Sequence, residues 1–142
     1  MTVPTPWNKK RAAPRPTEHA EQVAFVAYVR AAHPIYAKFL AAVPNGGMRA
    51  MKTAKRLKAE GVSPGYPDLL LDYSVGNYHG LRIEMKRARG SRGGAAGSDT
   101  TDEQDAWIAR LRHQGYAVAV CHGADEAIET FEQYIHREEI YS

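Results

Sequence analysis

Two short strand-like segments, joined by a glycine-containing loop, constrain the fold of this chain more than any other feature. Residues 68–75 (DLLLDYSV) form a short apolar run, and residues 81–87 (LRIEMKR) alternate apolar with charged residues. Both patterns are typical of β-strands. The loop between them, residues 76–80 (GNYHG), contains two glycines and an asparagine, which accept the unusual backbone angles of a hairpin loop. The sequence therefore predicts an antiparallel pair of strands.

Alternation along the second strand predicts which of its side chains share a face. Its apolar residues would point to one side of the sheet and its charged residues to the other. Glu84 and Lys86 would then lie on one face, about 6.6 Å apart along the backbone at roughly 3.3 Å per residue. Closing the hairpin lays Asp68 opposite the stretch near Lys86. Two carboxylates and one amine are thus predicted to meet at one end of the hairpin.

Such a cluster has the composition of a site that binds a divalent metal and activates water. Mg²⁺ takes oxygen ligands and is often held by one or two carboxylates plus a substrate phosphate. Lys86 could orient the water or, with a lowered pKa, help to deprotonate it. A lone Glu-x-Lys sequence is more simply interpreted as a solvated strand face, because short motifs often match by chance. The surrounding sequence has to decide between the two interpretations.

Four segments extend the pattern along the chain: residues 65–70 (GYPDLL), 83–86 (IEMK), 101–104 (TDEQ) and 111–116 (LRHQGY). The series resembles the virus-type replication-repair nuclease (VRR-Nuc) branch of the PD-(D/E)XK restriction-endonuclease-like superfamily, over roughly residues 18–135. The resemblance implies an α/β fold with a restriction-endonuclease-like core, in which helices flank a mixed β-sheet. It also implies a nuclease in which Asp68, Glu84 and the main-chain carbonyl of Met85 bind metal, with Lys86 as the catalytic lysine.

A helix is predicted over residues 18–31, with Thr17 as its N-cap. Positions 18, 22, 25, 26 and 29 form one face, so that Glu18 and Gln22 extend an otherwise apolar stripe. The VRR-Nuc resemblance implies a catalytic glutamate here, followed by glutamine four positions later, and Glu18 with Gln22 matches that spacing. Glu21 is an alternative, and Glu18 could instead be a favourable charge beside a helix N-terminus. The stripe favours Glu18.

A capping-box pattern at residues 100–103 (TTDE) predicts a second helix that begins there and ends before Gly115. Gln104 lies at the start of its apolar stripe, which continues through positions 107, 108 and 111. The resemblance implies that a Ser/Thr-x-x-Gln element reaches the active site, so Gln104 is expected to belong to it. The alternative is a hydrogen bond from Gln104 to the local backbone.

Composition and the remaining patterns indicate one small folded domain. With 142 residues, of which 44% are hydrophobic, the chain can form one core but not two. Residues 1–17 form a proline-rich basic arm, interpreted as mobile or as a featureless tail, and residues 18–142 form the domain. Strands are predicted at 39–43 and 116–121, and helices at 47–60 and 124–136. The single cysteine, Cys121, is expected to be buried.

Basic residues are concentrated away from the C-terminal segment, since residues 124–142 contain six acidic residues and one arginine. The helix predicted at 47–60 has a basic face, and a glycine-rich segment with nearby arginines follows the second hairpin strand. Phosphate contacts from such surfaces give affinity with little sequence information. A solvated helix face, a passive loop and, for Asn45, a turn residue are the alternatives. The predicted nucleic-acid contacts are Asn45, Arg49, Lys52, Lys55, Arg56, Arg87, Arg89 and Arg92.

The function that agrees with these observations is a Mg²⁺- or Mn²⁺-dependent endonuclease that hydrolyses DNA. The resemblance to junction-resolving enzymes indicates branched or four-way-junction DNA in replication, recombination or repair, cut by a homodimer. No apolar run approaches the ~20 residues needed to cross a bilayer, so we predict a cytoplasmic protein without membrane contact. The alternatives are a non-catalytic nucleic-acid-binding module and a restriction-type enzyme that recognises one sequence.

The six histidines show no paired spacing that would indicate zinc.

Overall fold

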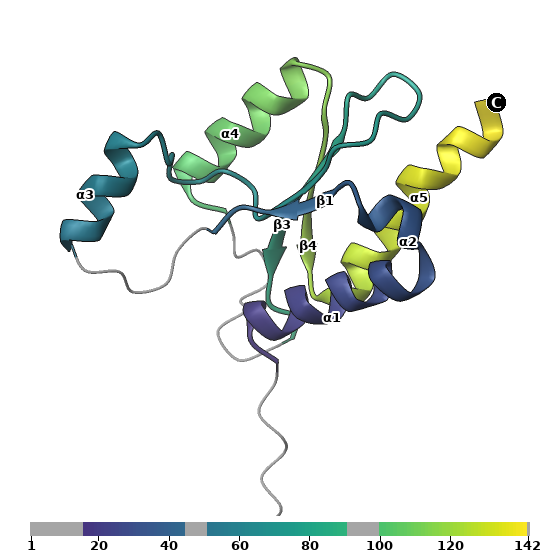
Figure 1. The fold of residues 1–142 in the computed structure, drawn as a ribbon, viewed down its shortest axis with the longest axis horizontal. Coiled ribbons are helices and arrows are strands. Elements are labelled where there is room, and N and C mark those ends of the chain that lie inside the picture. Colours follow the sequence, from purple (N-terminus) through teal and green to yellow (C-terminus); the bar gives the residue numbers. More distant parts are fainter. Residues whose placement is uncertain (1–15, 45–50, 91–99, 142) are drawn as a thin grey trace, which may run out of the picture.

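The computed structural model describes residues 16–44, 51–90 and 100–141, which form nine helices and strands. In chain order these are α1 (Glu18–Ala32), α2 (Pro34–Ala37), β1 (Leu40–Ala42), α3 (Met51–Ala59), β2 (Leu69–Leu71), β3 (Leu81–Lys86), α4 (Asp102–His113), β4 (Ala117–His122) and α5 (Ala124–Tyr141). Their arrangement is shown in Figure 1.

One mixed sheet with the strand order β1-β2-β3-β4 organises the fold. The pairs β1–β2 and β2–β3 are antiparallel, and β3–β4 is parallel. The prediction of an antiparallel pair around residues 76–80 is therefore confirmed, with Leu69 opposite Ile83. The predicted α/β class, with helices flanking a mixed sheet, is also confirmed.

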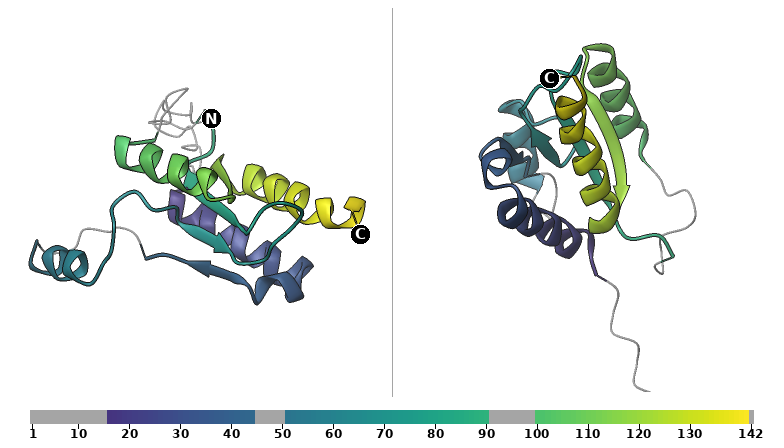
Figure 2. Two further views of the ribbon diagram at one scale, coloured as in Figure 1. Left: turned by 90° about the horizontal axis from the view of Figure 1, so that it is seen from above. Right: turned by 90° about the vertical axis from the view of Figure 1, so that its right-hand side faces the viewer.

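Helices cover the sheet on both faces (Figure 2). On one face α1 and α5 pack together, and the main core lies between them and the sheet. Phe25 of α1 and Phe131 of α5 are fully buried there, against Ile83 and Met85 of β3 and the predicted buried Cys121. On the other face α4 packs through Ile108 and Leu111 onto β4. The charged residues of β3 lie on this second face, because side chains alternate along a strand.

Capping threonines fix where α1 and α4 begin. Thr17 accepts a hydrogen bond from the Ala20 amide (3.1 Å), as predicted for the start of α1. In α4 the cap is Thr101 and the third helical residue is Gln104, so the predicted box of residues 100–103 was wrong by one position. The shift has a physical reason, since Gln104 completes the box by accepting from the Thr101 amide (3.0 Å).

Several predicted boundaries also differ from the structure. The strand predicted over 68–75 is limited to Leu69–Leu71, because Val75 and Tyr78 bond to each other and form a separate tight turn. The last helix continues to Tyr141 instead of ending near residue 136. The short helix α2 was not predicted, although Pro34 at its first position favours a helix start. Helix α3 is described from Met51, and residues 47–50 of the predicted helix lie outside the described residues.

Helix α3 stands apart from the sheet and from the other helices in Figure 1 and in the left view of Figure 2. The segment after it returns to the body and leads into β2. Within residues 16–44, 51–90 and 100–141, no helix is both long and apolar enough to cross a membrane.

Candidate active site

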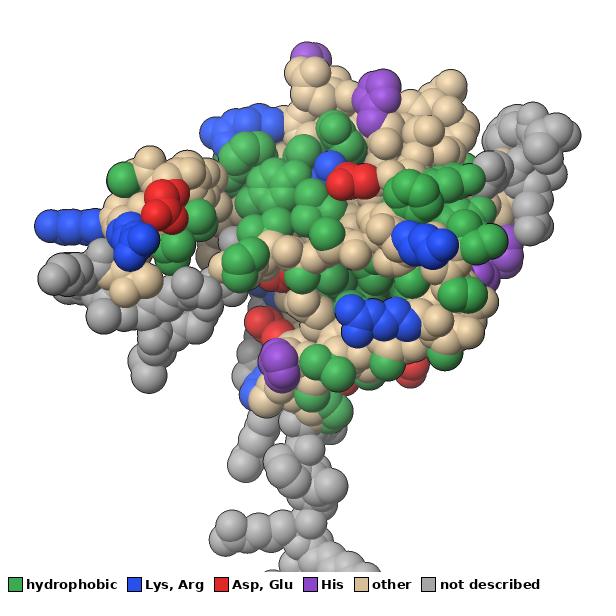
Figure 3. All heavy atoms as spheres, in the orientation of Figure 1, with side chains coloured by type: hydrophobic (Ala, Val, Ile, Leu, Met, Phe, Trp, Pro, Cys, Tyr) green, Lys and Arg blue, Asp and Glu red, His purple; other side chains and the backbone are tan. Residues whose placement is uncertain are grey.

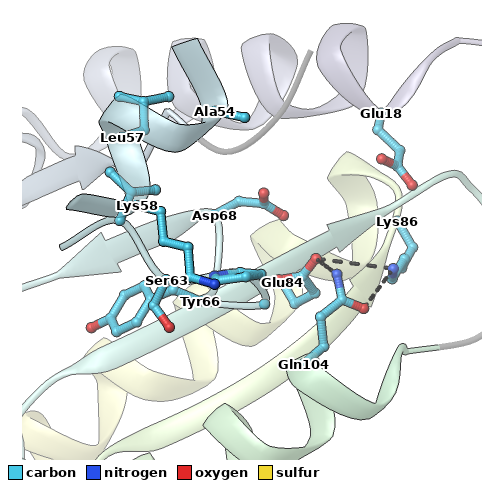
Figure 4. A pocket seen from close by; sticks show the side chains of 13 residues that line it. Glu18, Ala54, Leu57, Lys58, Ser63, Tyr66, Asp68, Glu84, Lys86 and Gln104 are labelled. Carbon is cyan, nitrogen blue, oxygen red and sulfur yellow. Dashed lines mark hydrogen bonds and ion pairs between the residues drawn. The ribbon is translucent and has the colours of Figure 1, made fainter. Parts of the chain in front are cut away.

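A pocket of about 610 Å³ lies between α3 and the α4-covered face of the sheet. Its polar side chains project from α1, from the start of β2, from β3 and from α4 (Figure 4). Those named as catalytic from the sequence all line it: Glu18, Asp68, Glu84, Lys86 and Gln104. Five residues that are up to 86 positions apart in the chain are thus brought to one cavity.

The hairpin register places Asp68 beside Glu84. Asp68 immediately precedes β2, and Leu69 pairs with Ile83, so Asp68 lies opposite Glu84, two residues before Lys86 and within the stretch that the sequence predicted. The Asp68 carboxylate accepts a hydrogen bond from the Met85 amide (2.8 Å), which fixes its orientation toward β3. Glu84 is only 4% exposed, although it is charged in its ordinary state.

Burial raises the pKa values of both carboxyl groups, and at Glu84 the charge of Asp68 raises the pKa further. For Glu84, burial is the largest cause, followed by the charge of Asp68, and together they raise its pKa to about 8 although Lys86 acts in the opposite direction. Burial also raises the pKa of Asp68, despite the hydrogen bond from the Met85 amide. Two carboxylates this close are unfavourable together unless more positive charge is near.

Gln104 connects the charged residues of the pocket. Its Oε1 atom accepts from the Lys86 ammonium (3.1 Å), and its Nε2 atom donates to Glu84 Oε1 (2.8 Å). The Lys86 Nζ and Glu84 Oε1 atoms are 4.0 Å apart. Because Gln104 also bonds to the Thr101 amide, both sequence interpretations apply: it caps its helix and contacts the site.

The two glutamates considered for α1 have different surroundings. Glu18 lines the pocket and points toward Lys86 (Figure 4), and its charge contributes to the raised pKa of Glu84. Glu21 lies one turn further along and accepts a short hydrogen bond from the Ala124 amide at the start of α5. That contact stabilises a helix N-terminus. Glu21 does not line the pocket.

The donor set of the pocket suits a hard divalent cation. Asp68 and Glu84 offer carboxylate oxygens, and the resemblance adds the carbonyl of Met85; Mg²⁺ and Mn²⁺ prefer oxygen ligands of this kind. In the described part of the chain, no group of three or more His, Cys, Asp and Glu side chains is placed to hold a metal. The two carboxylates suit a cation that completes its coordination with water or a substrate phosphate.

The predicted nucleic-acid contacts lie outside the pocket lining where the structure describes them. Lys55, Arg56, Arg87 and Arg89 are exposed, but Arg56 pairs with Glu60 (3.2 Å) and Arg89 with Glu126 (2.9 Å). Lys52 belongs to α3, and its side chain is not described. Outside the described residues lie Asn45, Arg49 and Arg92.

Lys58 is a pocket residue that was not named as a site residue from the sequence. It extends from α3 into the cavity beside Leu57 and Ala54 (Figure 4). The signal was present, because positions 54, 57 and 58 lie on one face of a helix at i, i+3 and i+4. The basic residues of this helix were instead interpreted together as one face that contacts phosphates, with a solvated face as the alternative.

Comparison with known proteins agrees with this geometry. The model of the VRR-NUC domain family matches residues 9–125, which include every residue of the pocket. The chain belongs to the VRR-NUC family. It is thus a member of a nuclease family, and the resemblance inferred from the sequence is confirmed. One solved structure, described as a VRR_NUC domain protein, is 30% identical with a TM-score of 0.70, over 84% of this chain and 88% of that chain. A search of curated proteins gave no match.

Proposed function

We propose that this VRR-NUC protein is a Mg²⁺- or Mn²⁺-dependent endonuclease that hydrolyses phosphodiester bonds in DNA. The observation that carries the proposal is the meeting of Asp68, Glu84 and Lys86 in one pocket, where Gln104 links Glu84 to Lys86. The carboxyl groups of buried Glu84 and half-buried Asp68, both with raised pKa values, lie beside an ammonium group. This arrangement is unfavourable for stability and suited to catalysis.

The chain's own residues have distinct roles in this reaction. Asp68, Glu84 and the Met85 carbonyl would hold the cation, which supplies positive charge at the phosphate and makes water more acidic. The Lys86 ammonium donates hydrogen bonds that orient the attacking water or a phosphate oxygen. Gln104 holds Lys86 Nζ and Glu84 Oε1 in place. Glu18 faces the same space from α1 and is a further acceptor for water.

The preferred substrate in this proposal is branched DNA, including four-way junctions, in replication, recombination or repair. A symmetric junction presents two equivalent strands, so a homodimer with two pockets would suit it. Exposed Lys55, Arg56 and Arg87 would contact phosphates outside the pocket. Such contacts predict an affinity that falls with rising salt.

A cleavage assay tests the proposal. Linear, flapped and four-way-junction DNA would be incubated with the protein in Mg²⁺, in Mn²⁺ and in EDTA, together with Asp68→Ala and Lys86→Ala. Matched controls remove the same charges elsewhere: Glu129→Ala on α5 and Lys38→Ala after α2, both at exposed positions. We expect metal-dependent cutting that both site variants lose and both controls retain.

The same assay separates the competing functions. Binding without cutting under every metal condition would support a non-catalytic nucleic-acid-binding module. Products confined to one sequence would instead support a restriction-type enzyme. The homodimer is tested separately by the mass of the protein in solution, where a monomer at assay concentration would contradict it.

A further inference from the structure

The pocket has an apolar half that the chemistry of phosphodiester hydrolysis does not use. Leu57, Val62, Pro64 and Tyr66 line this half, which is formed by α3 and the segment that follows it (Figure 4). Val62 is 38% exposed, so part of its apolar surface is open to a ligand. The apolar half therefore suits a part of the substrate other than the phosphate.

The part of this apolar wall that follows α3 is fixed to the helix that carries Gln104. The Trp107 Nε1 atom of α4 donates to the Ser63 hydroxyl (3.0 Å). Gly65 passes so close to α4 that an added Cβ atom would lie 2.7 Å from the Gln104 amide nitrogen. Because the wall and Gln104 are held together, a substrate on the wall has a defined position relative to the catalytic groups. Such preorganisation favours binding.

The ring of Tyr66 is held in place from two sides. It packs edge-on against Trp107, with 4.9 Å between the ring centroids, and its hydroxyl accepts from Arg82 Nε (3.1 Å). Arg82 is only 5% exposed and is itself paired with Asp72 (3.1 Å). Tyr66 thus offers the pocket a rigid aromatic surface, which is the kind of surface that nucleotide bases contact.

The charges around the pocket indicate an anionic ligand with an apolar part. Lys58 belongs to the apolar half, Lys86 to the polar half, and α3 adds exposed Lys55 and Arg56. The space-filling view shows basic side chains on the lobe formed by α3, and a broad hydrophobic area on the neighbouring surface of the body (Figure 3). A nucleotide combines these properties, because its phosphate is anionic and its base has apolar faces.

We propose that the apolar half binds the base and sugar of an unpaired nucleotide next to the phosphate that is cut. The inference rests on the proposed nuclease function and adds a preference among substrates. A base in a duplex enters a pocket only when unstacking and unpairing energy is supplied, so the site favours an unpaired nucleotide, as at a flap or branch point. The volume of about 610 Å³ lies within the range of roughly 300–1,000 Å³ that is usual for ligand sites.

A binding experiment with abasic DNA tests this inference. The full chain would be titrated into a fluorescent DNA hairpin with a single-stranded tail, in Ca²⁺, after confirming that the strand stays intact. A series of these hairpins is prepared, and each member lacks the base of one nucleotide near the branch point. Removal at one position should weaken binding by about 5- to 150-fold, the effect of losing one base contact of this kind.

Shortening the side chains of the apolar wall should remove the same contact with the base. The Leu57→Ala/Val62→Ala double variant should bind intact DNA as weakly as the wild type binds the critical abasic DNA, and should be insensitive to that abasic site. The fold should persist, because neither residue belongs to the main core or to the cluster under α4. Ile35→Ala, at a 69% exposed apolar position on α2, is the matched control.

The outcomes separate this inference from the nuclease proposal. Equal affinity for every abasic DNA, or a base effect that persists fully in the double variant, overturns the inference. If the wild type nevertheless cuts DNA in Mg²⁺, the nuclease proposal stands without it. A base effect that the double variant loses, in a protein that cuts no DNA in Mg²⁺ or Mn²⁺, supports the nucleotide site and contradicts the nuclease proposal.

Discussion

Glu84 on β3 is buried and Glu132 on α5 is half-buried, and their pKa values shift in opposite directions. Burial and the charge of Asp68 raise the pKa of Glu84 to about 8. At Glu132, burial also acts to raise the pKa, but hydrogen bonds from Tyr28 and His33 outweigh it and lower the pKa. Both donors lie 2.6 Å from Glu132 Oε1. The protein therefore compensates the charge of Glu132, whereas Lys86 and Gln104 compensate that of Glu84 only in part.

The comparison separates a stabilising region from a functional one. Glu132 joins α5 to α1 and to the α1–α2 junction, where the main core lies. Glu84 lies on the opposite face of the sheet, where nearby positive charge does not fully balance its carboxylate. This imbalance lowers the stability of the fold but attracts a cation. Sites that bind metal or substrate commonly contain such unfavourable arrangements, because their partner completes them.

The largest expected effect is the loss of cutting in Glu84→Gln. The substitution removes one charged ligand, so DNA cleavage in Mg²⁺ should fall by about 10³-fold or more, equivalent to several kcal/mol of transition-state stabilisation. Initial rates on the best substrate from the cleavage assay measure it. Retention of more than a tenth of the wild-type rate would show that Glu84 is not a metal ligand.

Gln104→Ala should have a smaller effect, because Gln104 positions other groups. Removing it frees Lys86 and leaves Glu84 Oε1 without its hydrogen bond. We expect cleavage to fall about 10- to 100-fold, which is usual for residues that orient metal ligands. Raising the Mg²⁺ concentration should recover part of the rate if the site is only loosened. Thr101 must remain intact in this test, since it caps the same helix.

Glu132→Gln should affect stability and not cutting. Its charged hydrogen bonds with Tyr28 and His33 would be replaced by weaker ones, so the free energy of unfolding should fall by about 1–3 kcal/mol. Urea denaturation measures this change. Glu129→Gln, at an exposed position on the same helix, should change stability by less than about 0.5 kcal/mol. A loss of cutting without a loss of stability in Glu132→Gln would contradict the separation of the two regions.

The dependence of stability on pH should have opposite signs for the two glutamates. A raised pKa in the folded state favours folding below the ordinary value of 4.5, and this contribution is lost as pH rises toward about 8. In EDTA, Glu84→Gln should therefore gain stability relative to the wild type between these pH values. The lowered pKa of Glu132 has the reverse effect, so the deficit of Glu132→Gln should shrink as pH falls below 4.5. If the free energy of unfolding changes with pH in the same way for the wild type and both variants, both pKa shifts are contradicted.

The arrangement around Glu84 was largely predictable from the sequence, because it depends on local periodicity. Alternation within residues 81–87 placed Glu84 and Lys86 on one face, and the loop at 76–80 predicted the antiparallel partner. Which residue lies opposite Asp68 was not predictable, since the register depends on how the turn at Val75 closes. A one-residue difference in strand pairing changes every contact along the ladder.

The hydrogen bonds of Glu132 were not predictable from local patterns. Glu132 is 99 and 104 positions from its partners His33 and Tyr28, and no spacing rule connects residues so far apart. Its position on α5 indicated only a charged residue next to an apolar stripe. The position of Lys58 in the pocket was not predicted for a related reason. The direction in which a basic helix face points depends on where α3 lies relative to the rest of the domain.

The measurement that tests the central claim most directly is an anomalous difference map from a crystal of this protein soaked in Mn²⁺. The account predicts one strong peak within coordination distance of the Asp68 and Glu84 carboxylates and the Met85 carbonyl, and its absence from crystals of Glu84→Gln. Data at saturating Mn²⁺ that show no peak in the pocket, or the same peak in Glu84→Gln, would contradict it.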